Sequence, residues 1–166
     1  MQRSVARVPD GSILAFDRIA SQLPTTSLML RNAGGCDPVN IHPYLQVDDF
    51  AFSTTQQDLV AHRGVPLHSS RNSVGLTEMD YGDSVFRFQD CGRLEEITKR
   101  APVVQLPHAT VPFQFLHGFV LSQDSDNFER AGFVVSPMFG LAFVPASPDW
   151  VTALARHCIE TWRSLR

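Results

Sequence analysis

The sequence contains little cysteine and almost no lysine, and both shortages bear on the chemistry to expect. Its three cysteines, Cys36, Cys91 and Cys158, are odd in number and far apart, so they match neither a disulfide framework nor a zinc-binding spacing. We expect three free thiols in a reducing cytoplasm, with no metal and no cofactor. Lys99 is the only lysine among 14 basic residues. This favours GC-rich bacterial coding, and a requirement for guanidinium groups is the alternative.

Long apolar runs and clusters of positive charge are also missing. The chain has no stretch of about 18 apolar residues that could span a bilayer. Its first residues, MQRSVARVPDGSILAF, carry charges and a turn where a secretory signal has an apolar core. The net charge is −3 and the basic residues form no cluster. We therefore expect neither nucleic acid nor a membrane as a partner.

The remaining composition is that of an ordinary globular protein. The chain has 166 residues, of which 43% are apolar and 19% charged, and its 12 Phe residues can fill a core. At this length we expect a single domain, 1–166. The alternative is two small lobes, 1–100 and 101–166, that share one core.

Local patterns predict an α+β fold, mostly antiparallel sheet with a short central helix and an amphipathic C-terminal helix. Ser53 or Thr54 can cap the central helix, 54–63, and Gly64 followed by Pro66 ends it. Strands are expected at 4–8, 13–16, 28–30, 49–52, 85–88, 93–98, 113–121, 131–135 and 139–144, with irregular, proline-containing connections at 36–47 and 101–112.

The C-terminal helix is expected over 148–163. Ser147 can cap it, and Pro148 suits its first position. Apolar residues recur at helical spacing from Trp150 to Trp162. Residues 151–156 also alternate between apolar and polar, so a strand there is the alternative.

Residues that could perform catalysis form no recognisable motif. His157 and Cys158 are adjacent, but neighbours on a helix point about 100° apart. This indicates a buried thiol beside an interfacial imidazole, not a nucleophile with its base. Glu95 and Glu96 are adjacent in a strand and are expected to face opposite sides, which is poor geometry for shared acid–base chemistry. The glycines match no phosphate-binding motif.

Acidic residues are concentrated in one hairpin between residues 78 and 96. Six acidic residues against Arg87 and Arg93 give this segment a charge of −4, whereas the whole chain carries −3. Turns use Asp for backbone hydrogen bonds and charged edges prevent aggregation, which would explain the acids structurally. The alternative is a surface that docks a basic protein. For that surface we nominate Asp80, Asp83, Asp90, Glu95 and Glu96.

Residues 50–98 resemble a known helix-plus-hairpin unit. The pattern is Phe52-Ser53-Thr54, Leu59-Val60 and Gly64-Val65-Pro66, followed by Tyr81, Val85-Phe86-Arg87-Phe88, Gly92-Arg93-Leu94 and Ile97. It is similar to the unit of β-lactamase-inhibitor-like domains, and comparable patterns occur in bacterial immunity proteins, which neutralise toxins. The resemblance implies a binding role. Such families share no fixed binding residues, so none is carried over to this chain.

Together these features predict a non-catalytic bacterial binding protein, an immunity-type inhibitor whose partner is a basic toxin domain. The alternative is a small enzyme or ligand-binding domain with a Phe-lined pocket that uses His108 or His117. A toxin-like reading frame beside the gene would favour the first function. A deep pocket with converging polar groups would favour the second.

Overall fold

A computed structural model describes residues 37–147 and 149–165, which contain three helices and thirteen strands. The helices are α2 (Gln56–Arg63), α3 (Phe113–Gln123) and α4 (Cys158–Ser164). The strands are β1 (Val39–His42), β2 (Gln46–Val47), β3 (Phe50–Ala51), β4 (His68–Arg71), β5 (Thr77–Asp80), β6 (Ser84–Phe88), β7 (Leu94–Arg100), β8 (Val103–Leu106), β9 (Ala109–Pro112), β10 (Phe128–Arg130), β11 (Phe133–Ser136), β12 (Leu141–Phe143) and β13 (Trp150–Leu154). The predicted α+β class is confirmed.

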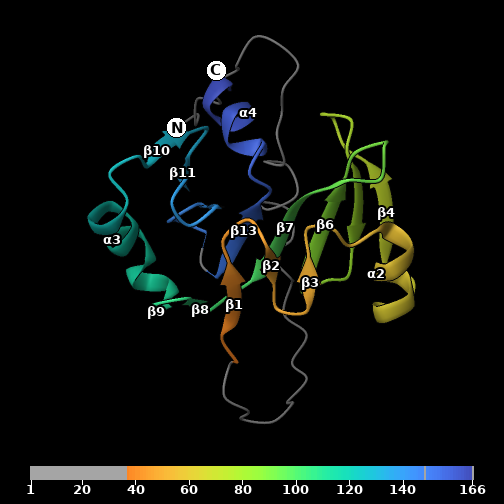
Figure 1. Cartoon of the computed structure of the whole chain (residues 1–166), viewed down its shortest axis with the longest axis horizontal. Coiled ribbons are helices and arrows are strands. Elements are labelled where there is room, and N and C mark those ends of the chain that lie inside the picture. Colours follow the sequence, from red (N-terminus) through yellow and green to blue (C-terminus); the bar gives the residue numbers. More distant parts are fainter. Residues whose placement is uncertain (1–36, 148, 166) are drawn as a thin grey trace, which may run out of the picture.

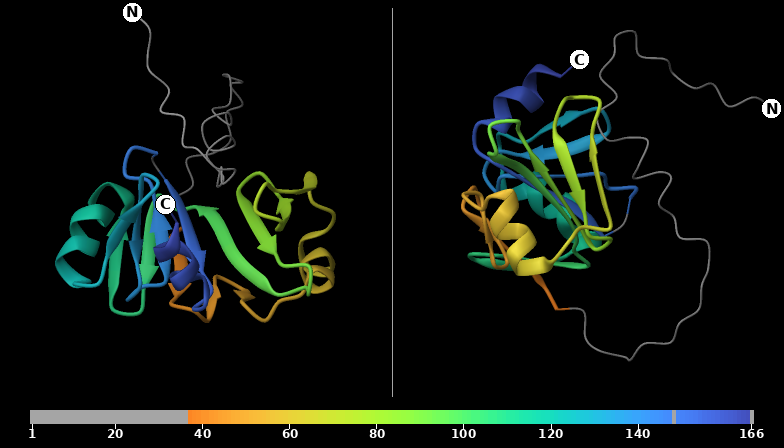
Figure 2. Two further views of the ribbon diagram at one scale, coloured as in Figure 1. Left: turned by 90° about the horizontal axis from the view of Figure 1, so that it is seen from above. Right: turned by 90° about the vertical axis from the view of Figure 1, so that its right-hand side faces the viewer.

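The strands form two sheets. The larger has eight antiparallel strands in the order β10-β11-β12-β13-β7-β6-β5-β4, and the smaller has five in the order β3-β2-β1-β8-β9. Within the smaller sheet β1 and β8 run parallel. Strands β1 to β3 lie in front of the larger sheet in Figure 1. Figure 2 shows from above that α2 and α3 lie at opposite ends of the molecule.

The main core lies between the two sheets. Phe86 and Phe88 of β6 belong to the same buried cluster as Val39 of β1, and α2 and α3 add Leu59 and Leu116. Strand β13 pairs over its whole length with residues 96–100 of β7, so the first and second parts of the chain share this core. A second cluster, around Phe133 and Trp162, packs α4 onto the larger sheet, with the two rings 5.2 Å apart.

The central helix and the hairpin are where the sequence placed them. Helix α2 begins one residue after Thr55, whose hydroxyl accepts from the backbone N–H of Asp58 while Asp58 accepts from that of Thr55. This reciprocal capping explains why so short a helix forms, although its cap lies one or two residues after the predicted one. Strands β6 and β7 match the predicted 85–88 and 93–98. Strands β11 and β12 lie within the predicted 131–135 and 139–144 to within one residue.

The predicted C-terminal helix over 148–163 is wrong. Residues 150–154 form β13, the alternative that their alternation allowed, and only Cys158–Ser164 is helical. Strand β13 lies between β12 and β7 and is buried on both faces. Apolar residues on both faces of a central strand imitate a helical stripe, which is the physical reason for the error.

Three further predictions are corrected. Residues 113–121, expected as a strand, belong to α3, whose buried Phe113, Leu116 and Val120 have helical spacing. The segment 101–112, expected as a connection, forms β8 and β9, because its prolines flank the strands or end the edge strand. The segment 36–47 contains β1 and β2. The predicted strands at 4–8, 13–16 and 28–30 lie outside the described residues.

None of the helices in the described residues is long and apolar enough to cross a membrane.

Candidate functional site

A bulge in β7 places the side chains of Glu95 and Glu96 on the face of the sheet that α4 covers. Strand β6 pairs Arg87 with Glu96 and Phe88 with Leu94, so the register shifts and Glu95 has no partner residue in β6. An extra residue of this kind locally rotates the strand. Both carboxylates then accept hydrogen bonds from side chains of the α4 region, His157 for Glu95 and Trp162 for Glu96. The expectation that they face opposite sides is therefore wrong.

Glu95 is a buried carboxylate that binds three donors. Arg93 Nε lies 2.6 Å from its Oε1, and His157 Nε2 lies 2.6 Å from its Oε2. The thiol of Cys158 donates to the same Oε2 over 3.2 Å. Burial alone would raise the pKa of Glu95, but the hydrogen bonds from Arg93, His157 and Cys158 outweigh it and lower the pKa. This carboxylate is therefore charged at neutral pH and ties β7 to the start of α4.

The surroundings of Cys158 favour the neutral thiol over a nucleophilic thiolate. Its side chain is buried, as the sequence indicated, whereas His157 is 41% exposed. Burial first, and the Glu95 carboxylate second, raise the pKa of the Cys158 thiol well above its ordinary value. A nucleophilic cysteine needs a lowered pKa and a cationic neighbour at the sulfur. Here the thiol is a neutral hydrogen-bond donor, and its imidazole neighbour bonds to Glu95.

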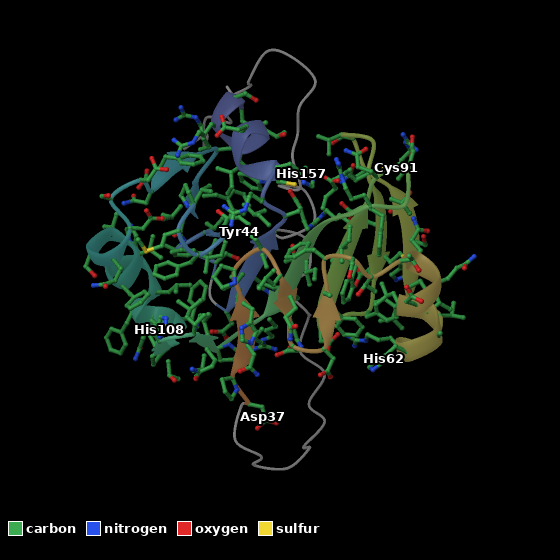
Figure 3. All side chains as sticks on the ribbon, in the orientation of Figure 1. Asp37, Tyr44, His62, Cys91, His108 and His157 are labelled. Carbon is green, nitrogen blue, oxygen red and sulfur yellow. The ribbon has the colours of Figure 1, made fainter. Side chains whose placement is uncertain are left out.

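The same three side chains offer a mixed set of metal-ligating atoms. One oxygen of Glu95, one ring nitrogen of His157 and the sulfur of Cys158 all lie within 4.8 Å of one another. Figure 3 shows His157 near the start of α4, well separated from His62 and His108. No sequence motif could have revealed this group, because Glu95 and His157 are 62 residues apart in the chain.

A buried ion-pair ladder lies beside this cluster on the larger sheet. Arg87 Nε is 3.2 Å from Glu78, and its Nη1 is 3.4 Å from Glu96 and 2.6 Å from the hydroxyl of Thr98. The Thr98 hydroxyl also contacts that of Thr152, at 2.9 Å. Burial raises the pKa of Glu96 despite Arg87 and the Trp162 hydrogen bond, which both lower it. The ladder lies mostly in the protein interior, and of its charged side chains Glu96, at 14% exposed, is the one that reaches solvent most.

The nominated acidic residues do not form one exposed surface. Asp80 is 4% exposed and Glu95 is 5% exposed, while Glu96 is half-buried. The exposed acids lie at opposite ends of β6, Asp83 just before it and Asp90 after it, and pair with Arg63 and Arg71. Cys91, next to Asp90, accordingly lies at the far end of these strands from His62 (Figure 3). A role of these residues in partner binding stays a prediction. Asp83 pairs with Arg63 at the end of α2, next to the loop that carries the exposed Val65 and Leu67, whereas Asp90 pairs with Arg71 at the end of β4.

Five residues where α2 meets the β5–β6 turn form what we call the loop–turn surface. They are Arg63, Val65, Leu67, Tyr81 and Asp83. Arg63 donates to Asp83 over 2.8 Å and lies 4.8 Å above the Tyr81 ring, and the Tyr81 hydroxyl donates to the carbonyl of Gly64 over 3.0 Å. These contacts fix the loop after α2 against the turn.

The loop–turn surface presents aliphatic side chains to solvent. Val65 is 83% exposed and Leu67 is 67% exposed. The backbone N–H of Leu67 donates to the Asp80 carbonyl, so the loop extends the edge of the sheet. A Cβ added at Gly82 would lie 3.2 Å from Leu67 Cδ1, which shows how closely the turn packs against the loop. The sequence indicated the helix stop here, but not that its residues would remain uncovered.

A shallow groove lies between the edge strand β9 and α3. It has a volume of about 580 Å³, and its lining includes Phe115 and Phe119 but neither His108 nor His117. Nε2 of His117 is buried without a hydrogen-bond partner among the described residues, and its ring lies edge-on to Phe143 at 6.5 Å. The groove thus has the predicted phenylalanines without the convergent polar groups that a catalytic pocket needs.

Comparison with known proteins gives no relative. No protein-family model, no curated protein and no solved structure matches the chain.

Proposed function

We propose that this protein is a non-catalytic bacterial binding protein, an immunity-type inhibitor of a cognate toxin, which it contacts through the loop–turn surface. The observation that supports the proposal is a rigid surface with uncovered aliphatic side chains. Val65 and Leu67 are exposed, and the Arg63 and Tyr81 contacts hold the loop that carries them. A preformed surface of this kind binds a partner with little loss of conformational entropy.

The loop–turn surface contains residue types that dominate the binding energy of protein–protein interfaces. Tyr and Arg are enriched among such residues, and exposed apolar side chains rimmed by charge mark protein contact sites. Arg63 and Asp83 provide the polar rim here. Burial would raise the pKa of Asp83, but hydrogen bonds from Ser84 and Arg63 outweigh it and lower the pKa, so Asp83 is charged at neutral pH. A negative charge beside the aliphatic residues suits a basic toxin domain.

Without a metal ion, the buried cluster around Glu95 offers no reactive group, which agrees with the non-catalytic part of the proposal. The thiol of Cys158 is held as a donor, and Glu95 is occupied by three donors. The described residues therefore contain nothing here that resembles a nucleophile with a free base. The groove beside α3 adds apolar surface but no titratable side chain to the lining that the structure describes.

The test begins with the reading frames next to the gene. Each is expressed in a bacterial host with and without this protein, and we expect one of them to be toxic alone and harmless when both are present. Affinity between the two purified proteins is then measured by calorimetry. Val65→Asp and Leu67→Asp should each weaken binding more than about tenfold, or about 1.4 kcal/mol, because each places a charge in a desolvated contact.

The matched control is Leu45→Asp. Leu45 is 69% exposed, much like Leu67, but it lies in the β1–β2 turn of the smaller sheet. This variant should bind the partner as tightly as wild type. If this protein neutralises the toxin but neither Val65→Asp nor Leu67→Asp weakens binding, the contact lies elsewhere on the molecule. A neighbouring product that is not toxic, or that remains toxic in the presence of this protein, would refute the immunity role.

A further inference from the structure

Three side chains of the kinds that hold zinc converge where α4 begins. Glu95 supplies an oxygen, His157 a ring nitrogen and Cys158 a sulfur, all within 4.8 Å of one another. We propose that these residues form a Zn²⁺ site, with the fourth position taken by water. This site is separate from the loop–turn surface and does not depend on the proposed function. It departs from the expectation of no metal, which rested on sequence spacing alone.

The donor set matches the preferences of zinc. Zinc binds thiolate, imidazole and carboxylate, and sites with three protein ligands keep one position open. Two of the three ligands are fixed by the fold: Glu95 lies in the bulge of β7, and Cys158 is the first residue of α4. The third, His157, is 41% exposed. An ion can therefore reach the group from solvent on the imidazole side.

The distances require only a small rearrangement. His157 Nε2 and Cys158 Sγ lie 2.6 Å and 3.2 Å from Glu95 Oε2, as expected when protons bridge them. Neighbouring ligands of a tetrahedral zinc ion are roughly 3.3–3.5 Å apart, given zinc–ligand bonds of about 2.0–2.3 Å. The sulfur–oxygen pair is close to this separation already. The nitrogen–oxygen pair must widen by less than about 1 Å, and the nitrogen–sulfur pair, which lies within 4.8 Å, must close by up to about 1.5 Å. Rotation of the exposed imidazole supplies both changes.

Charge and protons balance in the proposed site. The S–H bond of Cys158 breaks, a Zn–S bond forms, and the proton goes to water without any electron transfer. The imidazole proton between His157 Nε2 and Glu95 moves to Nδ1 through solvent, which leaves the Nε2 lone pair to bind the ion. Thiolate and carboxylate together neutralise the two charges of the ion. Burial and Glu95 raise the pKa of the free thiol, but coordination to a cation deprotonates a thiol outright. The remaining charge is that of Arg93, which donates to the other oxygen of Glu95.

The hydrogen bond from Arg93 orients the carboxylate. Because Arg93 Nε holds Oε1 at 2.6 Å, Oε2 is the oxygen that faces His157 and Cys158. Outer contacts of this type fix the direction of a metal ligand and are a regular part of zinc sites. The bulge in the backbone of β7 has the same effect, because it turns the side chain of Glu95 toward α4.

The experiment uses the full chain with Cys36→Ser and Cys91→Ser, so that Cys158 is the remaining thiol. Zinc is titrated by calorimetry in two buffers of different ionisation enthalpy at pH 8, and cobalt(II) replaces zinc for absorption spectroscopy. We expect one zinc per chain, release of the thiol proton, and a thiolate-to-cobalt charge-transfer band. His157→Gln, Cys158→Ser and Glu95→Gln should each weaken zinc binding by more than about tenfold, at least as much as loss of an outer contact does.

His157→Gln is the decisive variant, because this exposed position can be changed without emptying the core and Gln can still donate to Glu95. Its circular dichroism should match that of the parent. His108→Gln, at an exposed turn position of the smaller sheet, is the control and should leave affinity unchanged. Zinc binding that survives His157→Gln, a cobalt spectrum without the thiolate band, or the absence of stoichiometric binding would each refute the site.

Discussion

The indole nitrogen of Trp162 donates a hydrogen bond to a carboxylate oxygen of Glu96 over 3.1 Å. It joins the last helix to the bulged strand at the centre of the larger sheet, across 66 residues of sequence. The ring is itself 6% exposed and packs edge-on against Phe133. One side chain thus contributes both apolar burial and a partner for a buried carboxylate, so its removal should have two separable costs.

We expect Trp162→Ala to lower the free energy of unfolding by about 3–5 kcal/mol, because it empties a large buried volume. Trp162→Phe keeps most of the apolar contact and removes the hydrogen bond, so it should cost about 1–3 kcal/mol, the penalty for an unpartnered buried group. Urea denaturation followed by circular dichroism measures both. Thr161→Ala, at the exposed neighbouring position, should stay within about 0.5 kcal/mol of wild type. Equal losses for Trp162→Phe and Thr161→Ala would mean that the hydrogen bond contributes nothing.

Arg87→Met should be among the most damaging substitutions in the sheet. It leaves Glu78 and Glu96 buried without the guanidinium that both contact. Breaking a buried ion pair by removing one member costs about 3–5 kcal/mol. The double variant Arg87→Met/Glu96→Gln should recover part of this loss, because the neutral amide needs no counter-charge. Denaturant unfolding of both proteins gives the comparison, and a double variant no more stable than Arg87→Met would count against the ladder.

The adjacent carboxylates Glu95 and Glu96 should give pH dependences of opposite sign. The folded pKa of Glu96 is raised, so its contribution is fully present below the unfolded pKa of about 4.3 and is lost as pH rises through the folded value. The folded pKa of Glu95 is lowered, so its contribution is present above about pH 4.3 and is lost as pH falls through the folded value.

Unfolding free energies measured from pH 3 to 8 for wild type, Glu95→Gln and Glu96→Gln separate the two effects. Glu96→Gln should remove a decline in stability on the alkaline side of about pH 4.3. Glu95→Gln should remove a decline on the acid side. The charged or titratable neighbours of Glu95 are Arg93, His157 and Cys158, and those of Glu96 are Arg87, Glu78 and Glu95 itself. Substitution of a neighbour should shift the profile of the carboxylate that it faces. If both variants flatten the same limb, the opposite environments assigned to these residues are wrong.

Features fixed by neighbouring residues were predictable from the sequence. The short central helix and the turns that bound β6 depend on contacts within a few residues, although the cap is Thr55 and not the predicted Ser53 or Thr54. Strand β13 was not predictable with confidence, because burial on both faces gives an apolar pattern that also suits a helix. Only its pairing with β7 and β12 decides between the two.

The candidate sites could not be predicted from local sequence, because tertiary structure decides which of their residues meet. A bulge is specified by the pairing of β6 with β7, so alternation alone placed Glu95 and Glu96 on opposite faces. Acidic residues close in sequence were separated because Asp83 lies just before β6 and Asp90 lies after its other end. Conversely, Glu95 and His157 meet although they are distant in the chain. Local charge density therefore indicated which residues carry charge, but not which of them share a surface.

The separation of Asp83 and Asp90 gives a test of where a basic partner docks. Both aspartates pair with an arginine and are exposed, at 58% and 65% of their side chains, but only Asp83 belongs to the loop–turn surface. With the partner identified by the co-expression experiment, Asp83→Asn should slow association by up to about tenfold, while Asp90→Asn should leave it unchanged.

The difference should shrink in high salt, because exposed charges are screened beyond about 8 Å at physiological ionic strength. Both variants should keep wild-type unfolding curves, since exposed ion pairs contribute little to stability. Stopped-flow association at two salt concentrations provides the measurement. If Asp83→Asn and Asp90→Asn change the association rate equally, the partner does not dock preferentially at the loop–turn surface.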